Sequence, residues 1–186
     1  MKNTGMNMVG KLQKQNGLTL VEALLVLGIL AIVLAVVVPI ALSAGATQQA
    51  QNESRLIQSV ASKIQNIYNP RPDFGGLTTV VANEIRAFPE NMGDPAVNRF
   101  GAQVTVVTPP DAAKTPGANG ARQFQIDWPA VTADICSELA ASVGNSVGVD
   151  VDGVEVFNRG VSDLDIGAIG ANCDDGVTVS FVYGKN

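Results

Sequence analysis

The chain has 186 residues, of which 46% are hydrophobic, and a formal net charge of −5. Residues 1–17 contain three lysines and no acid, so the remaining chain has a charge of −8. This acidic surface disfavours nonspecific binding to phosphates, and no direct nucleic-acid binding is expected. The sequence has no histidine, which excludes Ser-His-Asp catalysis and histidine zinc sites. We therefore expect neither an enzyme nor a cofactor.

The N-terminal part combines a basic segment with a long apolar run. The lysines of residues 1–17 favour retention of this end in the cytoplasm. Residues 18–46 form an almost unbroken apolar run, longer than the roughly 20 residues that span a bilayer. Glu22 is the only ionisable residue in this run. An ordinary secretory signal would be cut after the run, near residues 44–46, and composition alone leaves that alternative open.

A helical pattern continues beyond the apolar run. Over residues 47–69 apolar side chains recur at steps of three and four, whereas polar residues such as Glu53 fall between them. Pro70 ends the pattern, which predicts one helix over residues 18–69, about 78 Å long at about 1.5 Å per residue. Pro39 lies inside it and predicts a kink. The expected apolar face consists of Leu56, Ile57, Val60, Ala61, Ile64, Ile67 and Tyr68.

Residues 70–186 have the pattern of one globular head with both helices and strands. Short helices are predicted over residues 77–88 and 131–143, the second ended by Gly144. Strands are predicted where apolar and polar residues alternate between turn-rich stretches. The strand candidates are residues 103–107, 122–128, 154–157 and 177–183. The chain is therefore expected to be of the α+β class.

Several acidic and aromatic residues of the head are candidate ligands for a bound group. Residues 150–155 contain three acids that hint at calcium ligands. They lack the regular ligand spacing of a calcium loop, so solvated acids in turns are favoured and no metal site is predicted. Phe124 and Trp128 lie in an alternating segment and are expected in the core. The acids that would have to complete a calcium site are Asp163, Asp165, Asp174 and Asp175.

The residues around the start of the apolar run resemble the processing motif of the type IV pilin family. That family has a basic leader, a Gly before the cut and a Glu as the fifth mature residue, and Gly17, Leu18 and Glu22 occupy these places. The resemblance implies cleavage by a prepilin peptidase between Gly17 and Leu18, and N-methylation of Leu18. It also implies a long helix packed on an antiparallel β-sheet. Leu18 in place of Phe and the 17-residue leader are most like the type IVb class.

Glu22 is predicted to guide assembly. A charge at the centre of a bilayer costs roughly 2.5 to 3.5 kcal/mol, so a carboxylate there usually has a partner. The resemblance implies that the amine of Leu18 on a neighbouring copy is this partner and fixes the register of the helices. There are two alternatives. Glu22 could pair with the amine of Leu18 in the same chain, or the segment could be a simple anchor whose Glu22 lies near the membrane–water interface. Pro39 matches a proline of many family members, and the resemblance implies that the helix loosens locally at this residue in a filament. The alternative is a mild kink that has no role in assembly.

Cys136 and Cys173 are the only two cysteines, and an exported location permits them to pair. Family members commonly have a disulfide-bounded C-terminal region on the filament surface, so the resemblance implies this pairing. Residues 133–144 are similar to the cysteine-bearing helix of toxin-coregulated pilins. Residues 98–101 resemble a turn of bundle-forming pilins, with Arg99 in place of a proline.

The resemblance implies the major structural subunit of a pilus that serves adhesion, aggregation or mating. The resemblance implies that the chain is first processed and held in the inner membrane by a single span surrounded by lipid. It implies that the chain later becomes part of an extracellular filament. The implied partners are other copies of the chain, the prepilin peptidase, the inner-membrane assembly machinery and an unknown surface receptor. A minor pilin or a type II secretion pseudopilin shares the N-terminal motif and stays open. A membrane-anchored periplasmic binding protein is the alternative from another class.

Overall fold

The computed structural model describes residues 19–108, 110 and 120–185. They fall into two compact units, one that ends at Ala41 and one that begins at Leu42. Helix α1 (Leu20–Tyr68) contributes to both units, and the second unit also contains the head. The predicted leader, residues 1–17, and Leu18 lie outside the described residues.

One stripe of α1 forms the base of the core of the second unit. Ile57, Val60, Ile64 and Tyr68 follow one another at steps of three and four, and each is buried. The predicted apolar face is therefore present, with one exception. Ile67 is 43% exposed because it lies beside the stripe and not on it.

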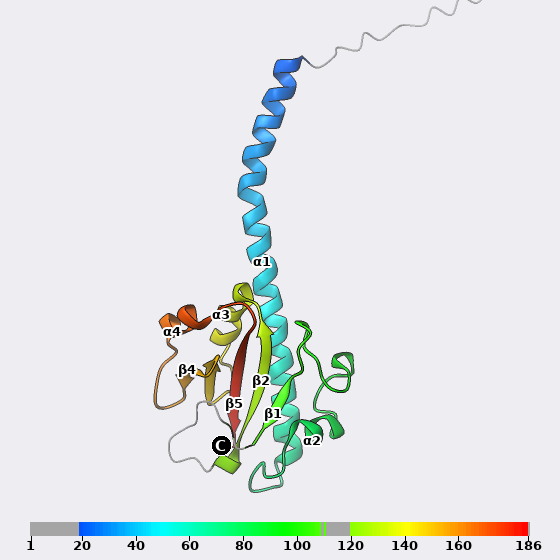
Figure 1. The fold of residues 1–186 in the computed structure, drawn as a ribbon, viewed down its shortest axis with the longest axis vertical. Helices are drawn as coiled ribbons and strands as arrows, with labels where there is room; N and C mark the ends of the chain where they lie inside the picture. Colours follow the sequence, from blue (N-terminus) through cyan, green and yellow to red (C-terminus); the bar gives the residue numbers. More distant parts are fainter. Residues whose placement is uncertain (1–18, 109, 111–119, 186) are drawn as a thin grey trace, which may run out of the picture. The chain divides into compact units, whose positions relative to one another are not determined.

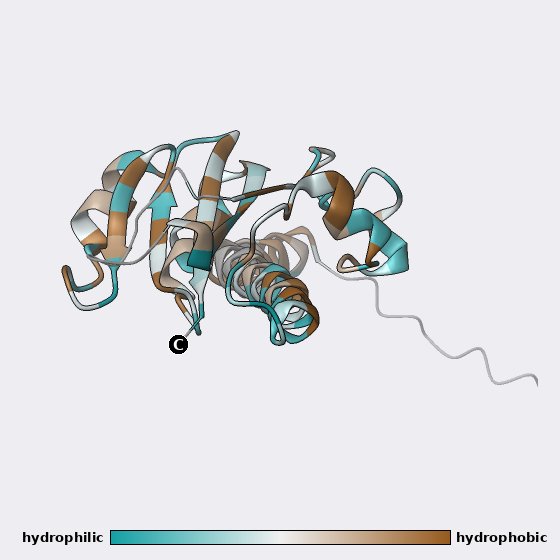
Figure 2. Ribbon diagram, turned by 90° about the horizontal axis from the view of Figure 1, so that it is seen from below, coloured by the Kyte–Doolittle hydropathy of each residue, from teal (hydrophilic) through white to brown (hydrophobic). Residues whose placement is uncertain are grey.

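The head contains one five-stranded sheet in which every pairing is antiparallel, in the order β1-β2-β5-β3-β4. Figure 1 shows the second half of α1 beside this sheet, with α2 next to β1, α3 next to β5 and β3, and α4 next to β4. The strands are β1 (Thr105–Val107), β2 (Gln123–Val131), β3 (Gly148–Val151), β4 (Val154–Asn158) and β5 (Val177–Gly184). The alternation of apolar and polar residues along the strands is visible in Figure 2 as bands of brown and teal.

The central strands align their large side chains in register. Phe124 pairs with Tyr183, Ile126 with Phe181 and Trp128 with Val179, and all six are buried. Because residues two apart along a strand share a face, these pairs line the same face of the sheet. Phe124 and Trp128 thus belong to the core, as predicted.

The helices of the head are shorter than predicted, and one was missed. Helix α2 (Thr79–Glu84) begins at the side-chain cap of Thr78 and stops before Arg86, whose φ of 52° is left-handed and cannot continue a helix. Helix α3 (Ala133–Ala141) lies inside the predicted segment. Helix α4 (Ile166–Asn172) was not predicted. The remaining helical turns are the 3-10 segments Glu90–Met92 and Gly120–Arg122.

Strand β3 was also missed, and it corrects the interpretation of the acids at residues 150–155. Asp150 lies in β3 and is only 6% exposed, so it is not a solvated turn acid. Asp152 and Gly153 do form the exposed turn between β3 and β4, with positive φ at both residues. The prediction was therefore wrong for Asp150, because a four-residue strand is too short for its alternation to be recognised.

A buried hydrogen bond joins α1 to the sheet. Trp128 Nε1 donates to Glu53 Oε2 at 3.0 Å, and Glu53 is 7% exposed. Glu53 was expected between the apolar positions, but it lies four residues before Ile57 and so extends the buried stripe. Burial raises the pKa of the Glu53 carboxyl above its ordinary value of 4.5, while the Trp128 bond and the charge of Arg99 act in the opposite direction.

This raised pKa predicts a pH dependence of stability. Because the folded state holds the Glu53 proton more tightly than the unfolded state, the stabilisation is complete below 4.5 and is lost as pH rises through the folded pKa. Glu53→Gln keeps an acceptor for Trp128 without the charge. The melting temperature of Glu53→Gln minus that of the wild type should therefore increase as the pH rises above 4.5. Fluorescence of Trp128, the only tryptophan, reports unfolding.

Glu84→Gln is the matched control, because Glu84 is exposed. Its difference from the wild type should stay flat over the same pH range. A flat difference for Glu53→Gln as well would show that the buried carboxyl does not contribute to the pH dependence.

Candidate functional site

The first half of α1 is apolar and bare. Residues Leu20–Val37 are long and apolar enough to cross a membrane, with a mean hydropathy of 3.0, and none of this segment is buried. Leu20 is 76% exposed, Leu27 62% and Ile32 70%. A contiguous apolar surface of this extent is rare on a soluble monomer and requires lipid or protein around it.

Glu22 lies in the first turn of this bare helix. Its backbone N–H donates to Thr19 Oγ1 at 3.3 Å, and the N–H of Ala23 donates to the Thr19 carbonyl at 3.0 Å. Thr19 and Glu22 have the spacing of a capping box, a helix-start signal that the sequence reasoning missed. An acidic residue at this position also lies favourably in the field of the helix N-terminus.

Two predicted processing residues and one predicted assembly residue lie wholly or partly outside the described part of the chain. Gly17 and Leu18 lie outside the described residues, so the scissile bond stays a prediction. Pro39 lies within α1, whose helical assignment continues through it, but its side chain is outside the described part. The proposed loosening at Pro39 likewise stays a prediction.

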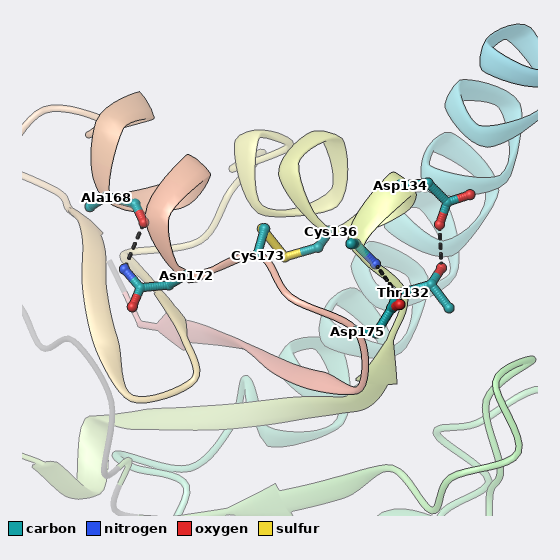
Figure 3. Close-up of a disulfide and its surroundings, with 8 residues drawn as sticks. Thr132, Asp134, Cys136, Ala168, Asn172, Cys173 and Asp175 are labelled. Atoms are coloured by element: carbon teal, nitrogen blue, oxygen red, sulfur yellow. Dashed lines mark hydrogen bonds between the residues drawn. A yellow bond between two sulfur atoms is a disulfide. The ribbon is translucent and has the colours of Figure 1, made fainter. Parts of the chain in front are cut away.

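The predicted disulfide between Cys136 and Cys173 is confirmed, with the two Cα atoms 5.5 Å apart. It ties α3 to the end of α4, as Figure 3 shows. Asp175 Oδ1 accepts from the N–H of Ala133 at 2.9 Å, so the chain just after Cys173 also caps the start of α3. The disulfide and this cap hold together the two ends of residues 133–175, which we call the disulfide-bounded region.

The turn at residues 98–101 is organised by Asn98. Its Oδ1 accepts from the N–H groups of Phe100 and Ala102, both at 3.1 Å, and its Nδ2 donates to the Pro129 carbonyl at 2.6 Å. Gly101 has a φ of 82°, which favours glycine. The loop is thereby fixed to β2 at the point where the register shifts after Trp128.

The acidic side chains of the described residues do not gather into a metal-binding cluster. No group of three or more His, Cys, Asp or Glu side chains in that part of the chain could hold a metal ion. Asp165, one of the candidate calcium ligands, instead caps α4, because its Oδ1 accepts from the N–H of Ala168 at 2.9 Å. The functional features that remain are the bare helix, Glu22 and the disulfide-bounded region.

Comparison with known families agrees with these features. Residues 47–184 match the family described as PilS N terminal, and residues 12–38 match the prokaryotic N-terminal methylation motif. The chain therefore belongs to the PilS family, and it is a type IVb-like pilin. No curated protein sequence shows significant similarity to it.

The solved structures that share the fold include two type IV pilins. A type IV b pilin from Salmonella typhi has 18% sequence identity and a TM-score of 0.54, over 73% of this chain and 99% of that one. TcpA, a type IV pilin from the Vibrio cholerae El Tor biotype, has 16% identity and a TM-score of 0.53, over 75% and 99% of the two chains. At these identities the likeness establishes the fold alone.

Without the disulfide, the free energy of unfolding of the head should be lower. The cross-link joins residues 37 positions apart, and the chain-entropy model assigns about 3.8 kcal/mol to a loop of this length. The double variant Cys136→Ser, Cys173→Ser should lose roughly that free energy of unfolding in urea, followed by Trp128 fluorescence. Adding a reductant to the wild type should give the same shift. An unchanged midpoint in both experiments would rule out a stabilising role for the disulfide.

Proposed function

We propose that this pilin is the major structural subunit of a type IVb-like pilus. The observation that carries the proposal is the bare apolar segment Leu20–Val37, which begins with a single carboxylate at Glu22 and leads into a folded head. Before assembly, lipid of the inner membrane covers this segment as a single span. In the filament, the same segments of neighbouring copies cover one another.

Processing prepares the charge that assembly needs. A prepilin peptidase cleaves between Gly17 and Leu18, and the new amine of Leu18 is methylated and keeps its positive charge. The methylation motif over residues 12–38 supports this step. Residues 1–17 are removed, and the assembly machinery of the inner membrane then moves the subunit into the filament.

Glu22 sets the register between subunits. In an apolar bundle the attraction between a carboxylate and an ammonium is strong, and an unpaired charge there is costly. A helix shifted along its neighbour by the wrong distance leaves both Glu22 and the partner's amine unpaired. Pro39 removes one helical hydrogen bond and allows the helix to adjust as it leaves the bilayer.

The pilus has a mechanical and adhesive function, with no catalysis by the subunit. The disulfide-bounded region is available to a surface receptor, and adhesion, aggregation and mating are all compatible with it. A minor pilin and a type II secretion pseudopilin share the N-terminal features. The disulfide favours a pilin, and a major subunit should dominate surface filaments released by shearing, whereas a minor one should be scarce.

Substitution of Glu22 should separate insertion from assembly. Glu22→Ala and the isosteric Glu22→Gln remove the charge, so both should insert into the membrane normally and yield few or no sheared filaments. Glu22→Asp keeps the charge and should retain part of the yield. Normal surface pili in Glu22→Gln would remove the charge register from the mechanism.

The mass of the mature subunit tests processing. Intact mass spectrometry of sheared filaments should give a chain that begins at Leu18 and carries one methyl group. Gly17→Pro should block the cut and leave the full chain in the membrane fraction. A mature chain that begins near residue 46 would indicate an ordinary secretory signal instead.

A further inference from the structure

A cationic hollow lies where α1 and β5 both end. It has a volume of about 450 Å³ and is lined by Gln65, Asn69, Arg71, Arg122 and Lys185, among others. Three of the nine basic residues that follow the leader thus meet in one place. Without residues 1–17 the whole chain has a net charge of −8. No acidic side chain of the described residues lines the hollow.

One of the three cations serves the fold. Lys185 Nζ donates to the Tyr68 carbonyl at 2.6 Å and also to the Arg71 carbonyl, so it satisfies acceptors at the end of α1 and just after it. It also lies 5.4 Å from the centre of the Phe74 ring. Lys185 therefore contributes positive charge to the hollow but is fixed in place.

The other two cations have no carboxylate partner in the described part of the chain. The Arg71 guanidinium stacks 5.2 Å from the centre of the Tyr68 ring. Arg122 is the exposed last residue of the 3-10 turn Gly120–Arg122, and it lines the hollow. Asp73 is near Arg71 in sequence, but its Oδ1 accepts from the N–H of Gly75 at 2.9 Å. Planar guanidinium groups are well suited to bind carboxylates in pairs.

Exposed acidic side chains gather near the start of β5, at the opposite end of the head; we call this the acidic end. The N–H of Asp152 donates to the Thr178 carbonyl near the start of β5, and Asp174 lies just before that strand. Both are exposed, as are Asp134 and Asp175 nearby. Asp134 and Asp175 are engaged in local hydrogen bonds, whereas the carboxylates of Asp152 and Asp174 have no bond to the described residues. Gly184, which lines the hollow, is the last residue of β5. At roughly 3.3 Å per residue it lies about 23 Å from the first residue of this strand, Val177. Figure 1 shows the two ends of β5 at opposite ends of the sheet.

The geometry of a filament brings opposite ends together. Copies related by a screw operation keep the same polarity, so a head displaced along the axis presents its acidic end toward the basic end of another. Heads placed side by side without displacement would instead bring like charges level with each other. Chains of net negative charge repel one another. The hollow provides a local attraction to the acidic end of a neighbour that is displaced along the axis.

We infer that the cationic hollow at Arg71 and Arg122 is an interface that receives the acidic end, Asp152 and Asp174, of a second copy of this chain. The inference rests on the proposed polymerisation and adds a second contact to it. Glu22 sets the register of the apolar helices, and the hollow sets the displacement of the heads.

Charge reversal at each end tests this contact in the full-length chain. Arg71→Glu with Arg122→Glu makes both ends acidic, and Asp152→Lys with Asp174→Lys makes both ends basic. Each pair alone should lower the yield of sheared filaments by about tenfold or more. All four substitutions in one chain restore opposite ends and should recover the yield.

Co-expression of the two defective chains provides an independent readout. An alternating copolymer of an all-acidic and an all-basic subunit satisfies every contact, so the two chains should form mixed filaments that neither forms alone. Lys63→Glu with Arg86→Glu is the matched control, because both residues are exposed and lie outside the lining of the hollow. This control should assemble at the wild-type level.

Three results would overturn the inference. The first is wild-type yield from either reversed pair. The second is a fourfold variant that has an intact disulfide and native Trp128 fluorescence but still fails to assemble. The third is normal filaments that lose only their binding to an anionic surface, which would assign the hollow to an external ligand. If the wild-type chain itself forms no filament, the proposed function fails first and the inference with it.

Discussion

One helix must satisfy two environments, and the rest of the structure depends on this constraint. In its second half, α1 buries Ile57, Val60 and Ile64 almost completely under the sheet. In its first half, none of Leu20–Val37 is buried. The core of the head is therefore complete without the N-terminal segment, while that segment has no partner among the described residues. Folding and assembly thus use different surfaces of one element.

Hydrogen bonds also join the head to this helix, and they lie at different positions along it. Trp128 meets Glu53 near the start of the buried stripe, and Lys185 holds the carbonyls at the end of α1. Gln65 Nε2 also donates to the Gly184 carbonyl at 3.1 Å, so β5 is tied to α1 near its end. A force transmitted along α1 would be shared between these contacts and the apolar core.

The sequence was informative where structure depends on local periodicity or on unique residues. The long helix, four of the five strands and the disulfide were predictable, since α1 has a regular apolar stripe and only two cysteines exist. Strand β3 and helix α4 are short, and α4 is rich in Gly and Ala, so neither has a clear period. The burial of Glu53 was not predictable because its partner Trp128 is 75 residues away. The cationic hollow depends on tertiary structure in the same way, since Arg71, Arg122 and Lys185 are far apart in sequence.

The most direct test of the central claim is a density map of the assembled filament at side-chain resolution. It should show the Glu22 carboxylate within about 4 Å of the amine of Leu18 on a neighbouring subunit, with apolar side chains around the pair. A carboxylate that contacts only lipid, solvent or the amine of its own chain would contradict the account of how these subunits align.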